Sequence, residues 1–303
     1  MRFGRRTVSS QRRHETIQAY TYLTPILLVI AAFALAPLWI TAWKSLYAIS
    51  FLNPGHARFI GLANYRTLVV QDPRFRSALF NTLWFTLVSV SLELVLGMVM
   101  ALAMHRAFKG RGLLRAAVLV PWAIPTVVSA RMWGWMYHDK FGVLNDILVR
   151  MHLLSKGYPW LADPHWAMPA VIFADVWKTA PFMALLLLAG LQMIREELYE
   201  AARIDGAGAW RQFWHVTLPL IRLQMMVALV FRTMDALRVF DLPYVLTGGA
   251  SNTETLTMYN QNLFFVAWDY GKGAAASVLQ FLLVALFSAL YFRLLGQQLA
   301  GDR

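Results

Sequence analysis

Long runs of uncharged, apolar residues dominate the chain and are separated by shorter polar segments. The first run extends from Tyr20 to Trp43 without a charge. Because a hydrocarbon core of about 30 Å needs roughly 20 apolar helical residues to cross it, each run of this length predicts a transmembrane helix. Six spans are expected, over residues 20–43, 78–104, 116–137, 167–194, 218–238 and 274–292.

These spans use most of the chain and predict one all-α integral membrane domain over residues 20–296. Residues 1–19 and 297–303 are expected to be terminal tails, and residues 195–217 a polar loop between the fourth and fifth spans. Five Arg precede the first run, as at the start of a signal peptide. The run is longer than a usual signal-peptide core, which favours an uncleaved first span.

The composition also favours lipid as the main solvent. Of the 303 residues, 58% are hydrophobic and 15% are charged, whereas soluble domains average about 25% charged residues. The formal net charge of +12 is interpreted as Arg and Lys that face anionic lipid and set topology, so no nucleic-acid partner is expected. The chain has no Cys, which excludes a disulfide, a thiol nucleophile and a Cys-ligated metal.

The distribution of Arg and Lys predicts the orientation of the spans. With the N-terminus inside, the inner segments hold fourteen basic residues and the longer outer segments hold ten. The density is therefore about twofold higher inside, as the positive-inside rule requires. A multi-pass protein with both termini and the loop 195–217 in the cytoplasm is expected.

The loop between the fourth and fifth spans carries the most specific pattern. Residues 196–203 favour a helix with acidic residues near its start, where the helix dipole stabilises them. Gly206 and Gly208 predict a turn, a second helical stretch follows, and Pro219 suits the first turn of the next span. The pattern predicts a short helix–turn–helix outside the bilayer, with an interfacial amphipathic loop as the alternative.

The same loop resembles the signature of binding-protein-dependent ABC importer permeases. Glu200-Ala201-Ala202 is followed at the family's spacing by Gly206 and by Val216-Thr217-Leu218-Pro219, with Val in place of Ile. Further segments resemble the flanking motifs of maltose/trehalose-type sugar permeases, namely residues 59–65, 177–182, 231–241 and 244–249. Permeases for amino acids and peptides share the Glu-Ala-Ala loop but usually lack these flanking motifs.

The resemblance implies a type I ABC importer permease fold that forms half of the path for a sugar, with trehalose or a related disaccharide as the first candidate. It implies a second permease subunit, two ATPase subunits that bind ATP and Mg, an extracytoplasmic substrate-binding protein, and the plasma or inner membrane of a prokaryote. The chain itself would be non-catalytic and bind no cofactor. It has no Gly-x-x-x-x-Gly-Lys-Ser/Thr run with which to cradle phosphates.

The resemblance also assigns roles within the loop, where the family has a coupling helix that docks on an ATPase subunit. Glu200 would offer a carboxylate to that subunit, Ala201 and Ala202 would allow close approach, and Gly206 would permit the sharp turn. Asp205, Leu218 and Pro219 complete the expected coupling set.

Charged residues within the spans are candidates for the substrate path. Such residues are expensive in lipid and usually face the bundle interior or a water-filled path. Arg232, Asp235 and Arg238 share one helical face at i, i+3 and i+6. Asp241 continues the series if the helix extends that far, and Asp175 and Lys178 form a second i, i+3 pair.

These side chains would hydrogen-bond sugar hydroxyls, with Trp177, Trp133 or Trp135 stacking on the sugar ring. The alternative is a structural ion-pair network, or pairing with the second permease. This alternative is favoured for the Asp175 and Lys178 pair, and left open for the series on the fifth span. For the single charges Glu93 and Arg131, a structural partner across the bundle is expected.

Three other functions are alternatives. A permease for glycerol phosphate or another oligosaccharide is the nearest alternative. A membrane-embedded glycosyl- or acyl-transferase would need convergent acid, base or nucleophile groups, and no such cluster is visible in the sequence. A self-sufficient ion-coupled carrier would need to work without ATPase partners. The seven His show no metal-ligand spacing, so no metal site is expected.

Overall fold

The computed structural model describes residues 5–50 and 56–301, with side chains described for residues 15–16, 18–50 and 56–294, and is mostly helical. Its first half contains α1 Arg5–Ile30, π-helical η1 Ala31–Leu35, α2 Ala36–Lys44, β1 Tyr47–Ala48, β2 Arg58–Phe59, α3 Ala63–Arg66, π-helical η2 Thr67–Gln71, α4 Pro73–His105, α5 Arg111–Ala123, α6 Thr126–Met136 and α7 Val143–Arg150. Its second half contains α8 Ala167–Leu191, α9 Glu196–Ile204, α10 Ala209–Gln212, π-helical η3 Phe213–Thr217, α11 Leu218–Leu220, α12 Arg222–Ala236, α13 Asp241–Thr247, α14 Leu256–Phe265 and α15 Tyr270–Gly301. The two strands pair antiparallel.

Four helical segments within the described residues are long and apolar enough to cross a membrane. They are Gln18–Lys44, Pro73–His105, Ala167–Leu191 and Tyr270–Leu294. Two bent helix pairs also qualify if each is one span, which brings the number to six. These pairs are Arg111–Ala123 with Thr126–Met136, and Ala209–Leu220 with Arg222–Ala236.

The bends fall within the expected third and fifth spans. For the third span, the sequence left open whether its prolines, Pro121 and Pro125, break the helix or mark an ordinary span end. The first pair bends by 92° and the second by 68°. At the first bend, Pro125 has no N–H, and Ile124 before it is extended (φ −72°, ψ 132°), because a residue that precedes Pro is pushed out of the helical region. The second bend falls at Ile221 (φ −98°, ψ 7°), two residues after Pro219.

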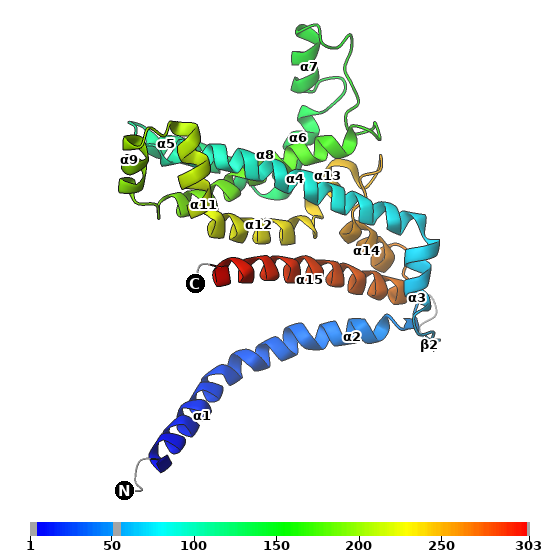
Figure 1. Ribbon diagram of the computed structural model, residues 1–303. Coiled ribbons are helices and arrows are strands. Elements are labelled where there is room, and N and C mark those ends of the chain that lie inside the picture. The colour runs from blue at the N-terminus through cyan, green and yellow to red at the C-terminus, as the bar shows by residue number, and fades with distance from the viewer. Residues whose placement is uncertain (1–4, 51–55, 302–303) are drawn as a thin grey trace.

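The two segments expected as terminal tails are helical where they are described. Helix α1 begins at Arg5, and α15 continues to Gly301. Figure 1 shows α1 curving away from the other helices, whereas α2 lies beside α15. The apolar stretch of the first span has none of its residues buried within this chain, so lipid or another subunit must surround it.

The centre of the molecule is the packing of α4 against α8, and glycine makes their close approach possible. A Cβ atom added at Gly97 would lie 2.8 Å from Met183 Cγ and 3.1 Å from the Ala184 amide nitrogen. Gly190 plays the same role between α8 and α12, where an added Cβ would lie 2.9 Å from Gln224 Cβ. Without such small residues the backbones could not come this close in lipid.

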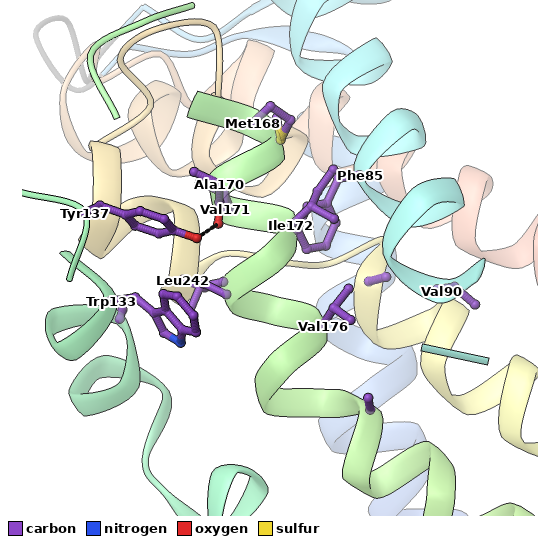
Figure 2. Packing of buried hydrophobic residues seen from close by; sticks show 14 residues of the cluster. Phe85, Val90, Trp133, Tyr137, Met168, Ala170, Val171, Ile172, Val176 and Leu242 are labelled. Atoms are coloured by element: carbon purple, nitrogen blue, oxygen red, sulfur yellow. Dashed lines mark hydrogen bonds between the residues drawn. The ribbon is translucent and has the colours of Figure 1, made fainter. Parts of the chain in front are cut away.

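A buried apolar cluster joins α8 to α4, α6 and α13. Figure 2 shows the cluster around Trp133, Val171 and Ile172, in which the Tyr137 hydroxyl donates to the carbonyl of Ala170 at 2.9 Å. This hydrogen bond satisfies the one polar group that Tyr137 brings into the apolar interior. The cluster therefore fixes α6 against α8 beyond the 92° bend.

The two ends of the α4–α8 pair carry different elements. In Figure 1, α9 and the start of α5 lie at one end, together with the C-terminal end of α15. The connection from α6 to α7, and helices α13 and α14, lie toward the other end, where α7 projects away from the bundle. The expected coupling loop and the C-terminal end of α15 therefore share one end of the bundle.

The projecting segment at the opposite end contains a buried side-chain amide that bonds to several groups of the segment. Asn145 donates to the carbonyls of His138 at 3.0 Å and Tyr158 at 2.9 Å. Its Oδ1 accepts from the Tyr158 amide at 3.0 Å and from Trp160 Nε1 at 2.9 Å. The Tyr158 hydroxyl donates to Asp163, and this hydrogen bond is the main reason that the pKa of Asp163 lies below its ordinary value.

Candidate functional site: a coupling segment and a buried charge cluster

Helix α9 forms the first half of the segment that the sequence singled out. It begins after Arg195, whose backbone is extended (φ −73°, ψ 138°), and it carries two acidic residues in its first turn and a basic residue in its last. Both placements complement the helix dipole. Arg203 also donates to Glu196 Oε1 at 3.0 Å across two turns of the helix.

The turn after α9 is a Schellman motif with glycine in the left-handed position. Gly206 has φ +77°. Its amide donates to the carbonyl of Arg203 at 3.1 Å, and the Ala207 amide donates to the carbonyl of Ala202 at 2.9 Å. These two bonds satisfy carbonyls that the end of the helix would leave free. The predicted helix, turn and second helical stretch are all present.

The surface of this segment is exposed and partly apolar. Glu200, Ala201, Asp205 and Gly206 are exposed, and Ala202 is half-buried. Large apolar side chains beside them are also exposed, with Ile204 at 86% and Trp210 at 74%. Exposed apolar side chains gathered in this way are typical of a surface that another protein or the membrane interface covers.

The far end of the segment is tied into the bundle. Tyr199 on α9 lies within hydrogen-bonding distance of Thr217, with 3.0 Å between their hydroxyl oxygens. Leu218 is half-buried and packs against the apolar cluster between α4 and α8, and Pro219 follows it at the start of α11. Tyr199 and Leu218 therefore connect this segment to helices inside the bundle.

The second candidate site is a guanidinium buried between three helices. Arg232 on α12 is 3% exposed. Its Nε and Nη2 donate to both carboxylate oxygens of Glu93 on α4, with 2.9 Å from Nη2 to Oε1. Nη2 also donates to Asp175 on α8, and Nη1 donates to Asp235 Oδ2 at 2.7 Å. Every nitrogen of the guanidinium thus faces a carboxylate.

The burial of these carboxylates differs sharply. The side chain of Glu93 is 0% exposed and that of Asp175 is 8% exposed, whereas that of Asp235 is 73% exposed. Thr179 Oγ1 lies 2.7 Å from Glu93 Oε1 and completes its surroundings. Removing one member of such a buried network costs about 3–5 kcal/mol, because it leaves an uncompensated charge.

The structure therefore brings Arg232, Asp235 and Asp175 together, but it does not pair Asp175 with Lys178 as their spacing predicted. Lys178 Nζ instead lies 3.5 Å from the carbonyl of Trp122, near the end of α5. The physical reason is that Arg232 offers Asp175 a fixed, forked donor from α12. The flexible ammonium of Lys178 is directed to another helix.

Arg238 and Asp241 lie apart from the cluster. Helix α12 ends at Ala236 and α13 begins at Asp241, with Phe240 between them outside the helical region (φ −138°). Asp241 therefore does not continue the face of Arg232. Arg238 is exposed and its Nε donates to the carbonyl of Met234 at 3.1 Å.

The tryptophans considered for sugar stacking have unequal access. Trp133 is 3% exposed and packs edge-on against Trp177, with 5.6 Å between ring centroids. It belongs to the apolar cluster of Figure 2 and is covered there. Trp177 lines an apolar cavity of about 500 Å³ between α4, α5 and α8, and Trp135 is exposed. Of the three, only Trp133 has no free face.

Glu93 is the member of the cluster that was missing from the predicted site. The sequence showed it as the one charge in a long apolar run, which indicated a partner across the bundle but not which partner. The structure supplies Arg232, 139 residues away. Arg131 is exposed, and among the residues that the structure describes it has no acidic partner within ion-pair distance. The described residues also hold no group of three or more His, Asp or Glu that could bind a metal.

Comparison with known proteins identifies the architecture. Residues 93–299 match the family described as binding-protein-dependent transport system inner membrane component. The chain belongs to this family. The predicted membership, the all-α fold of type I ABC importer permeases and the non-catalytic role of a membrane subunit are thereby confirmed.

Relatives match over nearly the whole chain. The trehalose/maltose transport system permease protein MalF of Thermococcus litoralis is 44% identical, over 94% of this chain and 96% of its own. The trehalose transport system permease protein SugA of Mycobacterium tuberculosis is 40% identical, over 97% of this chain and 93% of its own. The sulfoquinovosyl glycerol transport system permease protein SmoG of Agrobacterium fabrum is 37% identical, over 93% of this chain and 91% of its own.

A solved structure shares the fold. A chain of a bacterial ABC transporter involved in the import of the acidic polysaccharide alginate superposes with a TM-score of 0.80 at 24% identity, over 96% of this chain and 99% of its own. A second structure of a bacterial alginate ABC transporter, in complex with alginate pentasaccharide-bound periplasmic protein, gives a TM-score of 0.79 at 23% identity, over 93% and 94% of the two chains.

Proposed function

We propose that the chain is the permease subunit of an ATP-driven ABC importer and forms half of the translocation path for a sugar, a disaccharide such as trehalose. Family membership supports the permease role. The relatives at 40–44% identity are named for trehalose or maltose transport, which supports the sugar class. The observation that carries the proposal is the exposed Glu200–Gly206 segment, presented on a helix at one end of the bundle.

The proposed complex has four other subunits. They are a second permease, two ATPases that bind ATP and Mg, and an extracytoplasmic substrate-binding protein. The chain would lie in the plasma or inner membrane of a prokaryote, with both termini and the loop 195–217 in the cytoplasm. The excess of Arg and Lys in the segments on that side supports this orientation.

Within this complex α9 would be the helix that docks on an ATPase subunit. Glu200 would pair with the ATPase, and Ala201 and Ala202 would allow its surface to come close. Asp205 and Gly206 would end the helix sharply, which leaves Ile204 exposed for the same contact. Leu218 and Pro219 would then transmit the displacement of α9 into the bundle, because Leu218 packs between α4 and α8.

The substrate path would run along the exposed face of α12. Asp235 offers carboxylate oxygens there, and Arg238 lies one turn further along. Asp241 would lie further along this face, and Asp175 and Arg232 would hold its buried side. Lys178 and Trp177 would contribute from α8, where Trp177 lines the cavity between α4, α5 and α8. Carboxylates accept hydrogen bonds and the Arg and Lys groups donate them, which suits sugar hydroxyls because these both donate and accept.

The test is uptake by the complete complex reconstituted into liposomes. With ATP inside and loaded binding protein outside, trehalose should accumulate. Glu200→Gln should lower uptake and the ATPase activity stimulated by the loaded binding protein together, by about tenfold, because a charge pair at the docked interface is lost. Glu197→Gln is the matched control, since Glu197 is exposed in the first turn of the same helix.

Two results would contradict the proposal. Full uptake and full ATPase stimulation in Glu200→Gln would remove the coupling role of α9. Sugar uptake by this chain without ATPase subunits would identify a self-sufficient carrier instead. Glycerol phosphate and a longer oligosaccharide, each added as a competitor at a concentration equal to that of trehalose, test the substrate class. Neither should reduce trehalose uptake appreciably.

A further inference from the structure

The ion pair between Arg232 and Asp235 joins a buried group to an exposed one. The guanidinium is 3% exposed, and the carboxylate that it holds at 2.7 Å is 73% exposed. An exposed pair of two flexible side chains contributes little, because both must be ordered. Here the guanidinium is already fixed by its other bonds, so only the short Asp235 side chain has to be ordered.

Glu93 is the group that fixes the guanidinium. Its two oxygens accept from Nε and Nη2 of Arg232, a two-pronged arrangement that sets the plane of the guanidinium. Glu93 sits on α4, whereas Arg232 and Asp235 sit on α12. The direction of Nη1, which holds Asp235, is therefore decided by a different helix from the one that carries Asp235.

Asp175 adds a second constraint from a third helix. Nη2 of Arg232 donates to both Glu93 and Asp175, so the guanidinium cannot rotate without breaking bonds to α4 and α8 together. Among the described partners of Arg232, Asp235 is the only carboxylate with a largely exposed side chain. The network therefore has a buried, rigid part and one outward-facing end.

We propose that Glu93 and Arg232 are positioning residues, which hold the Asp235 carboxylate in one orientation at the surface of α12 so that it accepts hydrogen bonds from sugar hydroxyls. The inference rests on the proposed function, in which Asp235 lies on the path. Glu93 touches no sugar and acts only through Arg232. Its effect on transport is therefore expected to depend on Asp235.

A double-mutant cycle tests this dependence. The initial rate of trehalose uptake is measured in the reconstituted complex for Glu93→Gln, Asp235→Asn and the double variant, at equal amounts of assembled complex. Glu93→Gln should lower uptake by about tenfold, since a misplaced contact group costs one to two orders of magnitude. In the Asp235→Asn background, which keeps one acceptor oxygen, the same change should lower uptake by less than about twofold.

A purely structural role predicts a different pattern. If Glu93 only stabilises the bundle, its substitution should cost the same factor in both backgrounds, and that result would overturn the proposal. An unchanged uptake rate in Glu93→Gln or in Asp235→Asn would overturn it as well. Should Glu93→Gln fail to assemble, Arg232→Lys carries the same cycle, because Lys keeps the charge but cannot reach several carboxylates at fixed angles.

The control variant is Ser91→Ala on α4, two residues before Glu93. Ser91 is exposed and its hydroxyl donates to the carbonyl of Leu87 in its own helix, so uptake should stay within about twofold of the wild type. Absence of sugar uptake by the unmodified complex would refute the proposed function itself. Uptake by the wild type with equal losses in both backgrounds would refute the positioning role alone.

Discussion

Replacing Gly206 by Ala isolates the cost of one backbone conformation in the proposed coupling segment. Gly206 has φ +77°, and an added Cβ would have no heavy atom within 4 Å. Contact with neighbours therefore contributes nothing, and the cost is that of placing an L-residue in the left-handed region. That cost is about 1–2 kcal/mol.

The expected size of the effect follows from that free energy. A change of about 1–2 kcal/mol shifts an equilibrium by roughly 5–30-fold. If the ATPase binds only the native turn, its affinity for the permease pair should fall by up to the same factor, because affinity follows the binding-competent fraction and the full factor applies when the native turn of the free permease is the minor state. The affinity can be measured in lipid nanodiscs by titrating labelled ATPase subunits, with uptake as a second readout.

Two further variants make this prediction specific. Gly208 lies two residues away, also with open space around it, but its backbone is extended (φ −68°, ψ 169°), so Gly208→Ala should lower the affinity by less than Gly206→Ala. Gly206→Asn should lose less than Gly206→Ala, because Asn tolerates the left-handed region. Equal affinities for wild type and Gly206→Ala, or equal losses for the two Ala variants, would refute the reasoning.

Three other predictions concern packing and the projecting segment. Gly97→Val should lower the free energy of unfolding in detergent by about 3 kcal/mol, the upper end of the range for overpacking, because even a Cβ would lie 2.8 Å from Met183. Asn145→Ala should speed proteolysis of the segment around α7, because the groups that Asn145 bonds would lose their partner, and a buried polar group without a partner costs about 1–3 kcal/mol. Tyr158→Phe should raise the pKa of Asp163 toward its ordinary 3.8, because the lost hydrogen bond is the main cause of its depression; an NMR titration of labelled Asp measures this.

Each of these has its own control. Gly112→Val should be nearly neutral, because an added Cβ at Gly112 meets nothing within 4 Å. Asp146→Ala, next to Asn145, should leave proteolysis unchanged, since the exposed pair of Asp146 with Arg150 is worth little. For Asp163 the depressed pKa means that its stabilising contribution is present above pH 3.8 and is lost as the pH falls through the lower folded-state value. An unchanged Asp163 titration in Tyr158→Phe would contradict the assignment.

The features that depend on neighbouring residues along the chain could be predicted from the sequence. The apolar runs located the membrane-crossing helices, because lipid forces each run to satisfy its own backbone hydrogen bonds. The helix predicted over 196–203 and the turn at Gly206 followed from local rules of helix formation and helix ends, and both are present, the helix as α9 Glu196–Ile204. Pro125 marked the third span as breakable, although the choice between a break and an ordinary helix end stayed open.

The charge cluster, by contrast, was decided by the tertiary structure. Spacing along one helix suggested Asp175 with Lys178 and a continuous series from Arg232 to Asp241. In the packed structure of α4, α8 and α12, Asp175 instead pairs with Arg232, and Glu93, 139 residues away in the chain, also bonds to Arg232. Helix α12 ends before Asp241. Periodicity shows which side chains share a face of one helix. The ion-pair partner of a buried charge depends on which helices pack together, and this is set by the tertiary structure.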